Sequence, residues 1–244
     1  EEVVVPLTPS EQAAQDDAIA FAKAHRKAIA RRLTDPEIYP PEADPVSVFM
    51  AGSPGAGKTE ASLELIAQFE SQGWPVLRID PDELREEFHG YTGANAWLFQ
   101  TAVARVVDAV LDQAFRRDQS FVLDGTFASY DVSRKNVQRA LDKGRRVQIL
   151  YVYQEPMLAW GFVQAREAAE GRRIEPAHFV DQYFGARDVV NRLKAELGSQ
   201  VHVDLLMKNT DNSRRFYKAG VDVIDTHIPE RVHRVGLERL LGLA

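Results

Sequence analysis

The sequence has 244 residues, a formal net charge of −6 and no cysteine. A chain of this length holds one large α/β domain, or a domain with a small appendage, and without cysteine it has no disulfide framework and no thiol nucleophile. The acidic balance argues against nucleic-acid binding. No apolar run approaches the roughly 18 residues that span a bilayer and no signal peptide is visible, so we expect a cytoplasmic protein that binds neither nucleic acid nor membrane.

The first 45 residues predict a helical segment followed by a proline-rich linker. Residues 8–11 (Thr-Pro-Ser-Glu) are a typical helix start, and apolar residues then recur at helical spacing as far as Leu33. Four prolines between residues 36 and 45 would interrupt any helix or central strand. We therefore interpret residues 1–45 as an appendage and residues 46–244 as the core domain.

Residues 52–59 read Gly-Ser-Pro-Gly-Ala-Gly-Lys-Thr, a full match to the phosphate-binding pattern G-x-x-x-x-G-K-[ST]. An apolar run precedes them and a helical pattern follows, which is the strand–loop–helix context that the pattern requires. In such a loop Lys58 reaches the β- and γ-phosphates, and the Thr59 hydroxyl holds Mg²⁺. The sequence therefore predicts that ATP or GTP binds with Mg²⁺ at Gly52, Ser53, Pro54, Gly55, Ala56, Gly57, Lys58, Thr59 and Glu60.

From residue 46 onward, short apolar strands alternate with helices. The predicted strands are 46–51, 76–79, 120–124 and 147–153, and the predicted helices are about 58–72, 93–117 and 131–143. This alternation indicates an α/β fold, a P-loop NTPase-like parallel sheet covered by helices on both faces. Ligands of such sheets bind beyond the carboxyl ends of the strands, so the polar residues that follow each strand should converge on one cleft.

Three carboxylates follow these strands. Asp82 lies two residues beyond the second strand and could accept the proton of an acceptor hydroxyl beside the γ-phosphate; alternatively it is a helix cap or a surface acid. Asp80, which ends that strand, could cap the next helix. Asp124 follows the third strand, where many phosphate-loop proteins place a carboxylate near Mg²⁺, although an Asp-Gly pair is also a common turn.

Arg166, Arg172 and Arg173 lie in a predicted helix-to-loop region. A mobile lid near residues 160–180 could use them to neutralise charge on the transferring phosphoryl group. The alternative is a solvated basic helix end. The spacing leaves open whether Arg172 or Arg173 enters the site.

Three motifs together resemble the zeta toxin family of small-molecule kinases. They are the phosphate loop, residues 79–85 (Ile-Asp-Pro-Asp-Glu-Leu-Arg) and residues 123–126 (Leu-Asp-Gly-Thr), and the resemblance runs from about residue 46 to residue 195. That family phosphorylates the 3′-hydroxyl of UDP-N-acetylglucosamine and so starves cell-wall synthesis. The resemblance implies an ATP-dependent toxin kinase, part of a toxin–antitoxin system.

The resemblance also implies roles for the matching residues. Asp82 is the expected catalytic base, and the other expected catalytic residues are Lys58, Arg166 and Arg172 or Arg173. The expected substrate-binding residues are Asp82, Arg85, Asp108, Asp124 and Thr126, of which Asp108 falls where the family has an acid in its sugar-binding groove. The expected metal ligands are Thr59 and Asp124.

The sequence departs from the family pattern after Gly-Thr. The family often has glutamate where Asp124 stands and an arginine soon afterwards, whereas residues 127–130 here read Phe-Ala-Ser-Tyr. Arg134 could take the place of that arginine. Two other functions therefore stay open: a kinase for another small hydroxyl compound, such as an antibiotic or a nucleoside, and a nucleotide-dependent switch without transfer chemistry. Asp82 favours a kinase over a switch.

In this family a separate helical antitoxin typically blocks the nucleotide site. The first 45 residues have no expected counterpart in a minimal toxin core, so they could block the site in cis or pack on the sheet edge. Blocking would place Glu11, Asp16 and Asp17 against the phosphate site. In that case, deleting residues 1–44 would raise activity without unfolding the core.

Overall fold

A six-stranded sheet forms the centre of the computed structural model, which describes residues 6–208, 215–229 and 232–243. The strand order is β2-β3-β1-β4-β5-β6, and the neighbouring pairs are parallel except for β5 and β6. The strands are β1 (Val46–Ala51), β2 (Leu77–Ile79), β3 (Phe121–Leu123), β4 (Arg146–Tyr153), β5 (Val201–Lys208) and β6 (Arg215–Lys218). The predicted α/β fold is confirmed.

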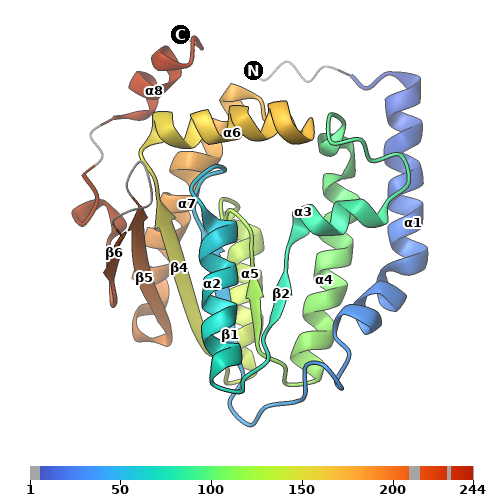
Figure 1. The fold of residues 1–244 in the computed structure, drawn as a ribbon, viewed down its shortest axis with the longest axis vertical. Coiled ribbons are helices and arrows are strands. Elements are labelled where there is room, and N and C mark those ends of the chain that lie inside the picture. Colours follow the sequence, from blue (N-terminus) through green and yellow to red (C-terminus); the bar gives the residue numbers. More distant parts are fainter. Residues whose placement is uncertain (1–5, 209–214, 230–231, 244) are drawn as a thin grey trace.

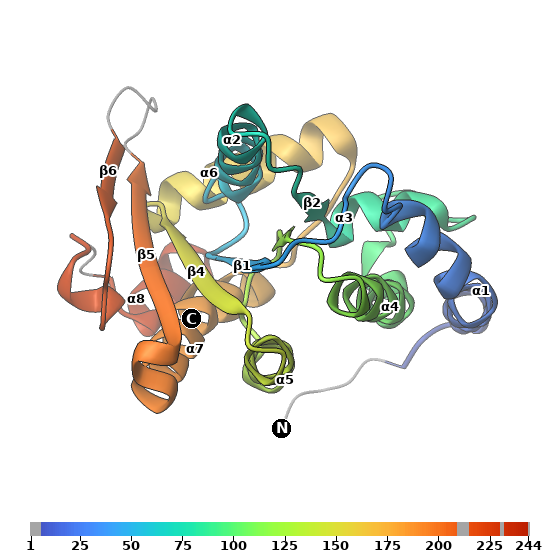
Figure 2. The ribbon, with the colours of Figure 1, turned by 90° about the horizontal axis from the view of Figure 1, so that it is seen from below.

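Helices cover both faces of this sheet (Figure 2). They are α1 (Pro9–Leu33), α2 (Lys58–Ser71), α3 (Pro81–Leu84), α4 (Gln100–Arg116), α5 (Tyr130–Asp142), α6 (Pro156–Glu170), α7 (Pro176–Leu197) and α8 (Arg234–Leu240). The α2 helix packs on one face, against Val48 and Met50 of β1. The α4, α5 and α7 helices share a larger core with Phe49 and Ala51 on the other face. Alternate side chains of β1 thus serve two cores, as expected for a central strand.

Four short 3₁₀ turns complete the described elements: η1 (Arg85–Glu87), η2 (Ala96–Phe99), η3 (Gly198–Gln200) and η4 (Ile224–Thr226). The predicted helix over 93–117 is therefore two elements, because η2 precedes α4. Figure 1 shows α6 crossing above the carboxyl ends of the strands, where the phosphate loop also lies. In the described part of the chain, no helix is long and apolar enough to cross a membrane.

The sheet extends further than the sequence analysis predicted, since no strand was assigned beyond residue 153. The missed β5 pairs with β4 from Val147↔Val201 to Tyr153↔Met207. His202 and Asp204 interrupt its apolar run, which hides the pattern of a buried parallel strand. The antiparallel β6 then adds an edge to the sheet.

The α1 helix is packed into the main core, at the edge of the molecule beyond α4 (Figure 1). Its start is a capping box, in which the backbone N–H of Glu11 donates to Thr8 Oγ1 and that of Thr8 donates to Glu11 Oε2. Small buried side chains, Ala18 and Ala22, let it approach α4 closely. Phe21 packs edge-on against Phe88, with ring centroids 5.2 Å apart.

The proline-rich linker is also fixed to the core. The side-chain amide of Gln119 donates to the carbonyls of Thr34 and Tyr39, at 2.9 and 2.7 Å. The backbone N–H of Glu42 donates to the carbonyl of Asp118 at 2.8 Å. For residues 6–45, which the structure describes, these contacts favour packing over blocking of the nucleotide site.

A pair of matched substitutions tests this packing. Ala22 is fully buried, whereas Ala24 on the same helix is exposed. Ala22→Asp places an unpaired charge in the core and should lower the free energy of unfolding by about 3–5 kcal/mol. Ala24→Asp should change it by no more than about 0.5 kcal/mol. Urea unfolding measures both, and equal midpoints for the two variants would contradict the packing. Deleting residues 1–44 should accordingly destabilise the core.

Candidate active site

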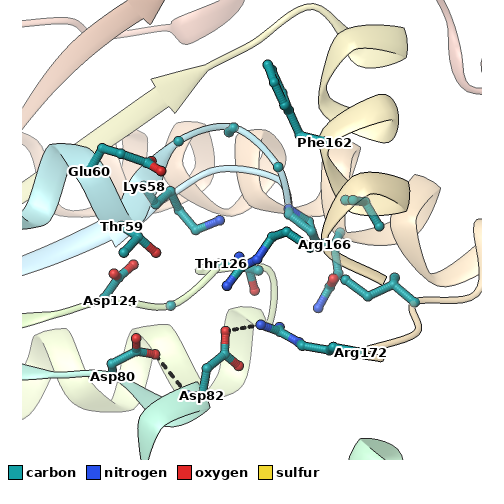
Figure 3. Close-up of a pocket in the computed structure, with 18 of the residues that line it drawn as sticks. Lys58, Thr59, Glu60, Asp80, Asp82, Asp124, Thr126, Phe162, Arg166 and Arg172 are labelled. Carbon is teal, nitrogen blue, oxygen red and sulfur yellow. Dashed lines mark hydrogen bonds and ion pairs between the residues drawn. The ribbon is translucent and has the colours of Figure 1, made fainter. Parts of the chain in front are cut away.

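A cavity of about 680 Å³ lies at the carboxyl ends of the strands, between the phosphate loop, α3 and α6 (Figure 3). Most of the predicted site residues line it: Pro54, Gly55, Ala56, Gly57, Lys58, Thr59, Glu60, Asp82, Arg85, Asp124, Thr126, Arg166 and Arg172. Gly52 and Ser53, the first two residues of the loop, are buried and do not line the cavity. Asp108 and Arg173 lie outside this cavity lining. The three sequence motifs therefore meet at one place.

The phosphate loop takes its shape from glycine. Gly57 is the N-cap of α2 with φ +88°, a left-handed conformation that side chains disfavour. The backbone N–H groups at the start of α2 and the positive end of its dipole can thus face an anion in the cavity. Lys58 donates from Nζ to the carbonyl of Ser53 at 2.7 Å. Burial lowers the pKa of Lys58 to about 8, so this ammonium is still largely charged at neutral pH.

Asp80 is the cap that starts α3. Its Oδ1 accepts a hydrogen bond from the backbone N–H of Asp82 at 2.8 Å, which is the capping role that the sequence allowed for Asp80. Burial and then the neighbouring Asp82 carboxylate raise the pKa of Asp80 to about 6. Capping explains why Asp82, two residues on, projects into the cavity while Asp80 is held at its edge (Figure 3).

Asp82 is held by two arginines. Arg85, one turn further along the chain, donates to Asp82 Oδ1 at 2.8 Å. Arg172, from the loop after α6, donates to Asp82 Oδ2 (Figure 3). Arg173 instead pairs with Glu175 at 2.9 Å, and both of those side chains are 62% exposed. Of the two adjacent arginines, it is therefore Arg172 that faces the cavity.

Asp108 and Arg134 lie among other charged groups. Asp108, on α4, accepts from Arg139 of α5 at 2.9 Å and lies 3.7 Å from the Lys135 ammonium. Arg134 donates to Gln138 at 2.6 Å, on the same helix. Neither residue lines the cavity in this conformation. A substrate-binding role for Asp108 thus rests on the family resemblance alone.

Sequence reasoning missed several residues that line the cavity, among them Gln154, Phe162 and Lys208. Gln154 directly follows β4, and Lys208 is the last residue of β5. The Lys208 ammonium donates to the Gly57 carbonyl at 2.9 Å. The rule that ligands bind beyond the strand ends would have pointed to both residues if β5 had been recognised. Phe162 of α6 also lines the cavity and is 43% exposed, and no local sequence signal distinguishes it from a core residue.

The donor set suits Mg²⁺ that arrives with a nucleotide. Thr59 supplies a hydroxyl and Asp124 a carboxylate to the same cavity. Mg²⁺ typically keeps several waters and binds through one or two carboxylates plus substrate phosphates. Within the described ranges, no group of three or more histidine or acidic side chains is arranged to hold a metal by itself. These two residues therefore fit a Mg²⁺–nucleotide complex.

Comparison with known proteins places this chain in a family. The model of the zeta toxin family matches residues 29–222. The chain belongs to the zeta toxin family. The toxin PezT of Streptococcus pneumoniae serotype 4 is 26% identical over 123 residues, or 48% of this chain. The match spans about half the length of that relative, 47%.

Solved structures show the shared fold. A chain in the structure of the PezAT chromosomal toxin–antitoxin system of Streptococcus pneumoniae has a TM-score of 0.60 at 20% identity, covering 97% of this chain and 94% of that one. A chain in the structure of AvrRxo1-ORF1:-ORF2 with ATP has a TM-score of 0.56 at 16% identity, covering 86% of this chain and 67% of that one. These likenesses are of fold.

The PezAT likeness also bears on the N-terminal helix. Because it covers 97% of this chain, most of α1 has a counterpart in that zeta toxin-like fold. The division of the chain into an appendage of residues 1–45 and a core of residues 46–244 stays a prediction. Glu11, Asp16 and Asp17 do not line the cavity either, which agrees with the packing role.

Proposed function

We propose that this protein is a zeta toxin-type kinase that transfers the γ-phosphoryl group of ATP, or GTP, to a hydroxyl of UDP-N-acetylglucosamine. The observation that carries the proposal is the position of Asp82, which lines the same cavity as Lys58 of the phosphate loop. A carboxylate beside a triphosphate site supports proton abstraction from an alcohol, which a nucleotide switch does not need. Membership in the zeta toxin family supports the same reaction.

The donor half of the site is the phosphate loop with the arginines opposite it. Lys58, which donates to the Ser53 carbonyl here, would turn its ammonium to the β- and γ-phosphates. Arg166 and Arg172 line the opposite wall and would neutralise the charge on the γ-phosphoryl oxygens. Mg²⁺ held by Thr59 and Asp124 would supply further charge neutralisation on these phosphates.

The acceptor half is built around Asp82. Its carboxylate takes the proton of the acceptor hydroxyl while that oxygen bonds to the γ-phosphorus. The bond from the γ-phosphorus to the β–γ bridging oxygen breaks, and the nucleoside diphosphate leaves. Arg172 must release Asp82 Oδ2 for the base to act, which frees the guanidinium for the phosphoryl group. Arg85 can remain on Oδ1 and hold the carboxylate in place.

A second acceptor class is supported by the segment after Thr126. The family often has an arginine soon after Gly-Thr, where residues 127–130 here read Phe-Ala-Ser-Tyr. The guanidinium of Arg134 donates to Gln138. The described segment 127–130 thus supplies no cation that could pair with the diphosphate of a nucleotide sugar. A kinase for a smaller, uncharged hydroxyl compound fits this feature.

An acceptor panel separates these functions. The purified protein is incubated with γ-labelled ATP and Mg²⁺ against UDP-sugars, nucleosides and small alcohols, and the products are identified by mass spectrometry and ³¹P NMR. We expect phosphorylated UDP-N-acetylglucosamine, and no product from Asp82→Asn protein prepared in parallel. A different phosphorylated acceptor would favour the second class. Hydrolysis of ATP without any phosphorylated acceptor would contradict the kinase proposal.

We also infer that an antitoxin protein is the partner of this chain. Two of the similar folds come from structures of two-component complexes, PezAT and AvrRxo1-ORF1:-ORF2. Arg166 and Glu60 both line the cavity and are exposed, so a second chain could contact the cavity there. Co-expression of this chain with a candidate antitoxin, followed by co-purification, tests this partner.

A further inference from the structure

Arg78 of β2 lies behind the cavity and bonds to four side chains. Its guanidinium donates to Asp124 Oδ2 at 2.6 Å, to Asp80 Oδ2 at 2.9 Å and to Glu83 Oε1 at 2.7 Å, and its Nε donates to Ser62 Oγ at 3.0 Å. The side chain is 10% exposed and does not line the cavity. Arg78 therefore contacts the site from beneath and would not touch a ligand.

We propose that Arg78 is a positioning residue that fixes the carboxylates at the ends of β2 and β3. This inference rests on the kinase function proposed above. The side chains of Asp80 and Asp124 are 10% and 4% exposed, and two buried carboxylates side by side repel each other. One nitrogen, Nη2 of Arg78, bonds to both. The single cation thus offsets two buried negative charges and sets their separation.

The two bonds reach both halves of the site. Arg78 holds Asp80, and Asp80 caps α3 by accepting from the backbone N–H of Asp82, so Arg78 helps to position the proposed base. Through Asp124 it bears on the proposed metal side, where Ser62 lies 3.0 Å from the same Oδ2. Ser62 is in turn 2.8 Å from the Thr59 carbonyl, at the end of the phosphate loop. Arg78 therefore links the acceptor half of the site to the donor half.

Replacement of Arg78 should lower kcat more than it lowers the affinity for ATP. Arg78→Met keeps an unbranched stem but removes the charge and the planar fork. Because small displacements of catalytic groups are costly, we expect kcat to fall about 10- to 100-fold. The KM for ATP should stay within about threefold, since the phosphate loop itself is retained. Arg78→Lys keeps the charge without the fork, and it should recover part of the lost kcat.

Glu83→Gln is the matched control. It removes the one exposed partner of Arg78, whose side chain is 68% exposed, and leaves the two buried pairs intact. An exposed ion pair contributes little, so kcat should stay within about twofold of wild type. The binding of a non-hydrolysable ATP analogue, measured by calorimetry, and the thermal midpoint are recorded for every variant.

A double-mutant comparison of Arg78 and Asp80 distinguishes a positioning role of Arg78 from a general loss of stability. If Arg78 acts through Asp80, then Arg78→Met should cost less kcat in an Asp80→Asn background than in wild type. Wild-type turnover with an unchanged kcat in folded Arg78→Met would overturn this inference alone. Equal, parallel losses of kcat and analogue binding would also overturn it, by assigning Arg78 a purely structural role. If Arg78→Met does not fold, Arg78→Lys with wild-type kcat overturns it. Wild-type protein without transferase activity would overturn both proposals.

Discussion

Lys58→Ala protein should be inactive as a kinase. The substitution removes the charge that holds the β- and γ-phosphates, and its loss from a preorganised site typically costs at least about 10²- to 10³-fold in rate. Lys58 is also bonded to the loop itself, at the Ser53 carbonyl, so the empty loop loses one contact as well. Steady-state kinetics with the acceptor found in the panel measure the loss, and any growth inhibition in cells should disappear with it.

An exposed lysine provides the control for Lys58. Lys143→Ala changes the charge of the protein equally, at the exposed end of α5 and outside the cavity. It should leave kcat and KM close to wild type. If Lys58→Ala kept more than a small fraction of the activity, the assignment of the phosphate loop as the donor site would be wrong.

Asp82→Asn should lower kcat by about two to four orders of magnitude with little change in nucleotide binding. Asparagine keeps the shape of the side chain and can still accept a hydrogen bond from Arg85, but it cannot take the proton of the acceptor. Single-turnover kinetics give the rate of the chemical step, and analogue binding gives the nucleotide affinity. Because the pairing with Arg172 is weakened, nucleotide affinity is expected to hold or rise slightly.

Asp80→Asn is the matched comparison for Asp82. Asparagine is among the best N-cap residues, so α3 should still start at the same place. We expect a smaller loss of kcat than in Asp82→Asn. A larger loss in Asp80→Asn would reverse the roles of the two carboxylates.

The fold could be predicted where the pattern of the chain is local. The phosphate loop, the apolar strand before it and the helix after it are contiguous, so the sequence placed β1 and α2 within a residue or two. The β5 strand could not be predicted this way, because Asp204 faces partners from elsewhere in the chain, Tyr217 and Gln148. Those partners become neighbours only after the sheet forms.

The motif residues of the site could be predicted from the sequence, whereas the residues that contact them from other parts of the chain could not. Asp82 and Lys58 follow from spacing, whereas the choice between Arg172 and Arg173 depends on backbone direction after Gly171, which ends α6 with φ +73°. No sequence pattern indicated a role for Arg78, because an arginine inside a strand is usually taken for an exposed residue. Its significance arises from Asp124, 46 residues further along the chain.

Gly55 allows the phosphate loop to pack closely against α6, and this contact affects how a substrate could enter the cavity. A Cβ at this position would lie 2.1 Å from the carbonyl oxygen of Ala159 and 3.2 Å from Val163, so the phosphate loop rests directly on the first half of α6. Ala159 and Val163 are themselves buried against α7 with Phe179. The first half of this helix is thus held in place, and a movement of α6 that opens the cavity would involve the residues beyond Val163. Arg172, in the loop that follows this end of the helix, bonds to Asp82, so the same movement would both admit a substrate and free the proposed base.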